Sequence, residues 1–96
     1  MKVSELTAGI IKDFCGISDE DSDDIIAVLI SSSKAYIRGY TNLTDEEIDG
    51  YEDITYACMV LANEMYSQRD YTVSTHRQVS PTVKNILNMY AKNHVG

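Results

Sequence analysis

The sequence predicts an all-α fold, a small helical bundle of about four helices with two long central helices. Residues 22–38 and 49–69 carry this prediction, because their apolar side chains recur at the three- and four-residue spacing of a helix. A third observation is that residues suited to capping a helix, Thr7, Thr44 and Ser80, precede three of the expected helical segments. We therefore expect one helical domain that spans residues 1–96.

A short first helix is expected after Thr7, whose side chain can accept a hydrogen bond from a free backbone amide. Its apolar face is supplied by Ile10, Ile11 and Phe14. Gly16 stands where a glycine commonly ends a helix. The acidic run at residues 18–24 then offsets the positive end of the next helix dipole.

The second helix is expected to run from about Ser22 to Arg38 and to carry one wide apolar face. That face contains Ile25, Ile26, Val28, Leu29, Ile30, Tyr36 and Ile37. Ser32 and Ser33 fall within it, where a hydroxyl can bond to the carbonyl four residues earlier and a small side chain lets another helix approach. Gly39 is predicted to close the helix.

Thr44 and Glu47 have the spacing of a capping box, in which each side chain satisfies a free backbone amide. Gly50 separates this short turn of helix from the long central one. The central helix is apolar nearly all round, which predicts burial on more than one face. One side carries Tyr51, Ile54, Cys58, Leu61 and Met65, and the other carries Tyr56, Met59, Val60 and Tyr66. Asn63 and Glu64 exclude a membrane span.

The helical pattern stops at residues 70–80, where Tyr71 and Val79 among Thr and Ser favour extended backbone. We expect a long loop or an extended arm here, and loops of this length are commonly functional. Ser80 as a cap and Pro81 at the first helical position then restart a helix. The face of this C-terminal helix consists of Val83, Ile86, Leu87 and Tyr90.

The charge balance argues against a protein that grips nucleic acid. The formal net charge is −7 and the isoelectric point is about 4.5, whereas non-specific affinity for nucleic acid comes from Lys and Arg displacing counterions. Residues 1–70 carry all 15 acidic side chains and 5 of the 8 basic ones, and the other 3 follow with no acid. An acidic body therefore precedes a basic tail.

No metal site is predicted. Asp19, Asp21 and Asp23 alternate like the opening of a calcium-binding loop, but Asp24 and Ile30 stand where such a loop needs Gly and Glu. The two histidines, His76 and His94, are far apart in sequence and neither has a Cys at zinc-site spacing.

No cofactor or catalytic site is predicted either. Cys15 and Cys58 lie in apolar helical surroundings, which predicts buried, unreactive thiols and no disulfide. The sequence contains no glycine-rich phosphate loop and no nucleophile with a nearby base. We therefore expect no enzymatic activity.

Four stretches together cover nearly the whole chain and share their order with one family. They are the opening VSELT with IIKDF, the helix DDIIAVLISSSKAYIRGYTNLT, the segment YEDITYACMVLANEMYSQRD and the closing SPTVKNILNMY. In this order the chain resembles the small head-to-tail connector proteins, also called head-completion or adaptor proteins, of long-tailed double-stranded DNA bacteriophages and their prophages. The family fold implied is a small all-α bundle with two long helices in its middle.

The resemblance implies a structural virion protein that forms a ring of about twelve subunits below the portal. The ring extends the DNA channel, through which DNA passes without specific binding, and it joins the head to a downstream connector or tail-completion protein. Synthesis in the bacterial host cytoplasm and a place at the head–tail junction of the virion are also implied, with no membrane contact.

Given that role, we expect the basic tail to make the subunit or portal contacts, because it complements the acidic body. The segment at residues 71–79 is expected to reach a neighbouring subunit, and the C-terminal helix is expected to dock. The predicted interface residues are Tyr71, Val73, His76, Arg77, Val79, Lys84, Leu87, Tyr90 and Lys92.

Two other classes of protein fit parts of the sequence. One is a small monomeric or dimeric helical adaptor or regulator that binds a single protein partner and forms no higher oligomer. The other is a small DNA-packaging or DNA-binding component, which needs a basic surface that residues 1–70 do not supply.

Overall fold

The computed structural model describes residues 1–16, 23–67 and 79–91. Within these ranges the chain forms a short 3-10 helix and five α-helices. In order they are η1 (Val3–Glu5), α1 (Ala8–Cys15), α2 (Asp23–Thr41), α3 (Asp45–Asp49), α4 (Glu52–Ser67) and α5 (Pro81–Tyr90). The all-α prediction is confirmed. Most of the expected extended arm, residues 70–78, lies outside the described residues.

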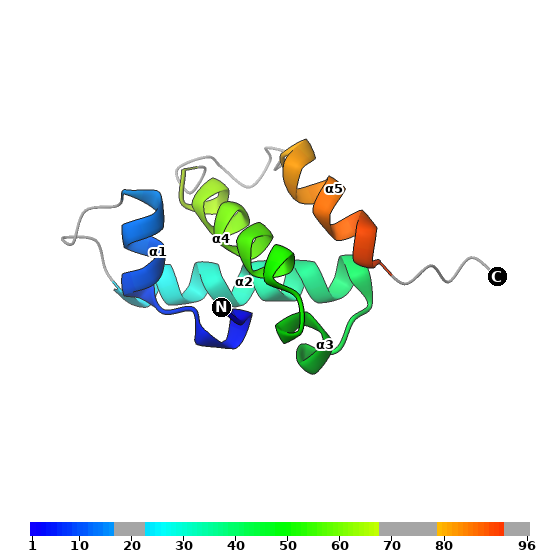
Figure 1. Cartoon of the computed structure of the whole chain (residues 1–96). Helices are drawn as coiled ribbons and strands as arrows, with labels where there is room; N and C mark the ends of the chain where they lie inside the picture. The colour runs from blue at the N-terminus through cyan, green and yellow to red at the C-terminus, as the bar shows by residue number, and fades with distance from the viewer. Residues whose placement is uncertain (17–22, 68–78, 92–96) are drawn as a thin grey trace.

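The helices pack in two layers. Helix α2 forms one layer, and α1, α4 and α5 lie across it in the other (Figure 1). The shortest extent of the molecule is 19 Å, which leaves room for two helices of about 10 Å diameter and no third layer. One long side of α2 is therefore covered by the other helices, and among the described residues no helix lies over its opposite side.

The core lies between the two layers. The facing sides of α2 and α4 meet through Ile26, Ile30 and Ile37 from α2 and through Ile54, Cys58, Leu61 and Met65 from α4. Ile11 of α1 and Val83 and Leu87 of α5 close the ends of this cluster and are fully buried. These side chains recur at three- and four-residue spacing, so each helix presents one stripe to the core.

All three predicted caps are present. The Thr7 hydroxyl accepts a hydrogen bond from the Ile10 amide at 3.3 Å, and the Ser80 hydroxyl accepts one from the Val83 amide at 3.4 Å. Thr44 and Glu47 form the predicted capping box, with reciprocal bonds of 3.2 and 2.9 Å. Because these contacts connect residues three apart, the local sequence is enough to predict them.

Gly39 does not close α2 as predicted, because the helix continues to Thr41. The Thr41 hydroxyl donates to the Ile37 carbonyl at 2.7 Å and accepts from the Leu43 amide at 3.2 Å. Asn42 then takes the left-handed conformation with a φ of 61°. Asparagine tolerates this conformation, so the Thr41–Asn42 pair ends the helix in place of the glycine.

The two serines of α2 have different surroundings. Ser33 is fully buried, and its hydroxyl donates to the Leu29 carbonyl at 2.8 Å and lies 3.6 Å from the Met65 sulfur. Ser32, which was expected on the same packed face, is exposed. The apolar face of α2 is therefore narrower than the sequence pattern suggests.

Several large apolar side chains expected in helical core stripes are on the surface instead. The most exposed of them in the described residues are Phe14, Ile25, Val28, Tyr51 and Tyr56. A helix in a two-layer arrangement is covered along one side only, so an apolar residue on the outer side stays in solvent whatever the width of the pattern. No helix of the described chain is long and apolar enough to cross a membrane.

Candidate interaction surfaces

The two thiols occupy different environments. Cys58 is fully buried in α4, and burial raises the pKa of its thiol to about 12. Cys15 was expected to be buried as well but is half-buried, and burial raises its pKa to a lesser extent. In the described part of the chain both thiols are free, and no group of three or more His, Cys, Asp or Glu side chains could hold a metal ion.

The predicted interface residues fall into three groups. Tyr71, Val73, His76, Arg77 and Lys92 lie outside the described residues. Val79 and Tyr90 are half-buried, and Lys84 is exposed on α5. Leu87 is fully buried in the core, so it holds α5 on the bundle and offers no side chain to a partner in this conformation.

Side-chain contacts at both ends hold α5 in place. At its start, the Ser80 amide donates to the Glu64 carboxylate at 3.3 Å. At its end, the Tyr90 hydroxyl donates to Asp53 at 3.0 Å, and this bond raises the Tyr90 pKa because it favours the protonated form. The Tyr90 ring also lies 4.3 Å from the ring of Tyr51, centroid to centroid.

Two exposed aromatic rings, one from α1 and one from α4, meet at the surface. Phe14 and Tyr56 contact edge to face with centroids 6.0 Å apart, and they are 43% and 46% exposed. Met59 and Val60 lie half-buried one turn beyond Tyr56. We call Phe14, Tyr56, Met59 and Val60 the aromatic patch.

A second uncovered surface runs along α2. Its members are all exposed and uncharged, and they are Ile25, Val28, Ser32, Ala35 and Gly39. The spacing alternates between three and four residues, which places all five on one side of the helix. Ile25 and Val28 are 48% and 62% exposed. We call these five residues the outer strip.

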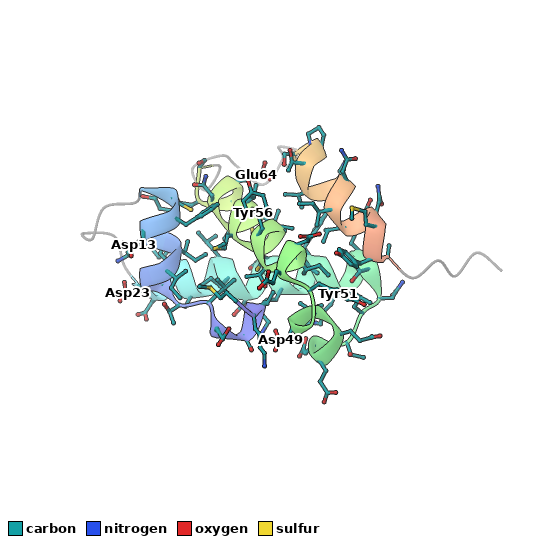
Figure 2. The ribbon with its side chains drawn as sticks, viewed as in Figure 1. Asp13, Asp23, Asp49, Tyr51, Tyr56 and Glu64 are labelled. Carbon is teal, nitrogen blue, oxygen red and sulfur yellow. The ribbon has the colours of Figure 1, made fainter. Side chains whose placement is uncertain are left out.

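The outer strip and the aromatic patch lie on opposite faces of the molecule. Val28 is two residues from each of Ile26 and Ile30, and Tyr56 is two residues from each of Ile54 and Cys58, and all four flanking residues are buried. Two residues correspond to about 200° of helix, so Val28 and Tyr56 each point away from the core. Figure 2 shows Tyr56 on α4, and α4 lies across the layer formed by α2.

Acidic side chains surround the α3–α4 junction. Asp45, Glu46, Glu52 and Asp53 are exposed there. Asp49, labelled below this junction in Figure 2, accepts a hydrogen bond from the Ser4 amide at 3.0 Å. Hydrogen bonds from Ser4 lower the Asp49 pKa because they stabilise its carboxylate. This end of the molecule therefore presents negative charge.

Sequence reasoning missed both uncovered surfaces. The outer strip was present in the sequence as the alternating spacing of Ile25, Val28, Ser32, Ala35 and Gly39. The wider apolar pattern of α2 hid it, because periodicity alone does not tell how many sides of a helix are covered. The Phe14–Tyr56 contact joins two helices, and nothing local in the sequence predicts it.

Comparison with known proteins finds a matching family. A family model described as "Phage gp6-like head-tail connector protein" matches residues 10–92, nearly the whole chain. Searches of curated proteins and of solved structures each found no match. The matched range includes α1 from Ile10 onward and all of α2, α3, α4 and α5, and so both uncovered surfaces.

Proposed function

The chain belongs to the family of phage gp6-like head-tail connector proteins, and from this premise we propose that it forms a ring of about twelve subunits below the portal. Membership gives the chain a structural role in the virion at the head–tail junction. In the proposed ring, the subunits extend the DNA channel of the portal and offer a platform to a downstream connector or tail-completion protein. The match over residues 10–92 is the observation that carries this proposal.

The charge distribution supports a channel through which DNA passes without being held. All 15 acidic side chains precede Tyr71 and outnumber the 5 basic ones there. Carboxylates turned toward the channel repel the phosphates, and the few basic residues give little counterion release. A DNA-packaging or DNA-binding component would instead need an excess of basic side chains.

The exposed side of α5 is the part of the described chain that we assign to portal docking. Lys84 and Asn85 are exposed there, and Met89 is 68% exposed. Because Leu87 is buried, we propose that these exposed side chains contact the portal instead. Residues 71–79 remain our proposed link to a neighbouring subunit. Synthesis in the host cytoplasm is part of the same proposal.

Native mass spectrometry over a concentration series, with negative-stain images of any large species, tests the ring. A closed ring of about twelve subunits supports the proposal. If the protein stays monomeric alone, the cognate portal is added, because a portal can template the ring. A chain that stays monomeric or dimeric and never joins the portal is instead an adaptor with another partner.

Charge reversal tests the docking surface separately. Lys84→Glu should weaken portal binding, and the loss should shrink as salt is added, because surface charges are screened. Lys2→Glu is the matched control, since it makes the same change at an exposed residue near the other end of the chain. The triple reversal at Arg77, Lys84 and Lys92 should have the larger effect. Equal behaviour of Lys84→Glu and Lys2→Glu contradicts docking through α5.

A further inference from the structure

We propose that the outer strip of α2 in one copy of the chain packs against the aromatic patch of the next copy. This inference rests on the proposed function, because it names the two surfaces through which neighbouring ring subunits meet. The occupant of each surface is thus a second copy of this chain.

The first support is the placement of the two surfaces. A head-to-tail contact needs two different surfaces on each subunit, so that every copy offers one and receives the other. Val28 and Tyr56 point outward from opposite layers of a molecule that is 19 Å thick. A symmetric dimer uses one surface twice and would leave the other in solvent.

The second support is the match in shape. The outer strip narrows toward its C-terminal half, where Ser32, Ala35 and Gly39 carry small side chains or none. Phe14 and Tyr56 are bulky and protrude on the other surface. Large side chains seated between small ones give the knobs-into-holes contact of packed helices. Ile25 and Val28 supply the apolar area at the other end of the strip.

The third support is the glycine within α2. A Cβ added at Gly39 would meet no atom within 4 Å, and the helix continues past this residue to Thr41. Glycine inside a helix is less favourable than alanine, and no contact within the described chain requires it at this position. Close approach of an outside surface gives a reason for it.

A matched pair of substitutions tests the strip in the assembled protein. Ala35→Arg places a bulky charge on the outer strip, and Ala27→Arg makes the same change at an exposed residue of α2 outside it. We expect Ala35→Arg to raise the concentration for half-assembly at least about tenfold, and Ala27→Arg to leave it near that of the wild type. Rings of Ala35→Arg that form like those of the wild type overturn this inference, and the proposed function stands.

Cross-linking tests the contact even where no stable ring forms. Val28→Cys and Tyr56→Cys are made in a Cys15→Ala background, and the buried Cys58 is retained. A short bismaleimide is added to each variant alone and to their mixture at high concentration. The mixture should give at least about ten times more dimer than either variant alone or than Ala27→Cys mixed with Tyr56→Cys.

The outcomes of this experiment separate the two proposals. A mixed dimer with no ring, even with portal present, supports the contact and contradicts the ring. If Val28→Cys alone gives as much cross-linked dimer as the mixture, the chain forms a symmetric dimer through α2, and the inference is overturned. A mixture that yields no more dimer than the control also overturns the inference. The outer strip and the aromatic patch would then be surfaces for portal or tail proteins.

Discussion

The ammonium of Lys12 lies 2.6 Å from the carboxylate of Asp23, and the two side chains differ sharply in burial, at 7% and 74% exposed. The contact joins the last turn of α1 to the first residue of α2 across residues 17–22. A buried ammonium without a nearby carboxylate carries a large desolvation cost. This ion pair therefore fixes where α2 begins relative to α1.

Loss of the carboxylate should destabilise the fold. We expect Asp23→Asn to lower the free energy of unfolding by about 1 kcal/mol, a moderate value because Asp23 itself is largely in solvent. Lys12→Met removes the buried charge and keeps most of the length of the side chain, so it should be neutral or stabilising. Urea denaturation measures both. A larger loss in Lys12→Met than in Asp23→Asn would contradict this account.

The capping box before α3 should contribute measurably. Thr44→Ala removes the acceptor for the Glu47 amide and should cost about 1 kcal/mol. Thr44→Ser keeps the hydroxyl and is the control, for which we expect a much smaller loss. Thermal unfolding of the three proteins side by side gives the comparison, and identical midpoints for alanine and serine would rule out a role for the bond.

The two cysteines should react at different rates. The pKa of about 12 at Cys58 leaves almost no thiolate near pH 8, and the thiolate is the reactive form. Cys15 is half-buried and should be labelled first by a thiol reagent. Cys58 should react only when urea unfolds the chain. Mass spectrometry of partly labelled protein reads out the order, and early labelling of Cys58 would show that α4 opens in the native state.

The same thiol makes stability depend on pH in the alkaline range. The folded chain keeps the Cys58 proton up to about pH 12, whereas the unfolded chain loses it near the ordinary value of 9.0. The unfolded state therefore binds fewer protons in this window, and the free energy of unfolding falls as pH rises through it. Tyr36, whose pKa burial also raises, contributes in the same direction. Cys58→Ala should flatten the slope, and an unchanged slope would exclude Cys58 as its source.

Local chemistry explains what the sequence could predict. The caps at Thr7, Thr44 and Ser80 depend on contacts three residues apart, and all three are present. The prediction that Gly39 ends α2 was wrong. A glycine often ends a helix, but here the hydrogen bonds of Thr41 and the positive φ of Asn42 end α2 two residues later. Competition between two possible stops depends on the surrounding structure.

The candidate surfaces depend on how many layers cover each helix, which periodicity does not record. Leu87 was predicted to touch a partner, but α5 packs it into the core. Phe14, Val28 and Tyr56 were assigned to apolar faces of their helices, but each lies on the outer side of its helix, away from the other layer, and is exposed. The sequence shows that these side chains are apolar. That they point outward is known only from the tertiary packing.

Gly39 distinguishes the needs of the fold from those of the assembly. Gly39→Ala should raise the free energy of unfolding of the isolated chain by about 0.5–1 kcal/mol, because alanine favours the helix and the added Cβ meets open space. The matched control is Gly16→Ala, where the space is also open but the φ of 69° is strained for alanine. That variant should lose about 1 kcal/mol.

The assembly should respond to Gly39→Ala in the opposite direction. If a neighbouring copy approaches the outer strip closely, the added methyl occupies part of the space that the neighbour fills, and the concentration for half-assembly should rise although the subunit is more stable. Sedimentation velocity and urea denaturation on the same preparation measure the two effects. A variant that is stabilised and assembles as well as the wild type would mean that Gly39 does not lie in the contact, whereas stabilisation with weaker assembly requires a close neighbour at α2.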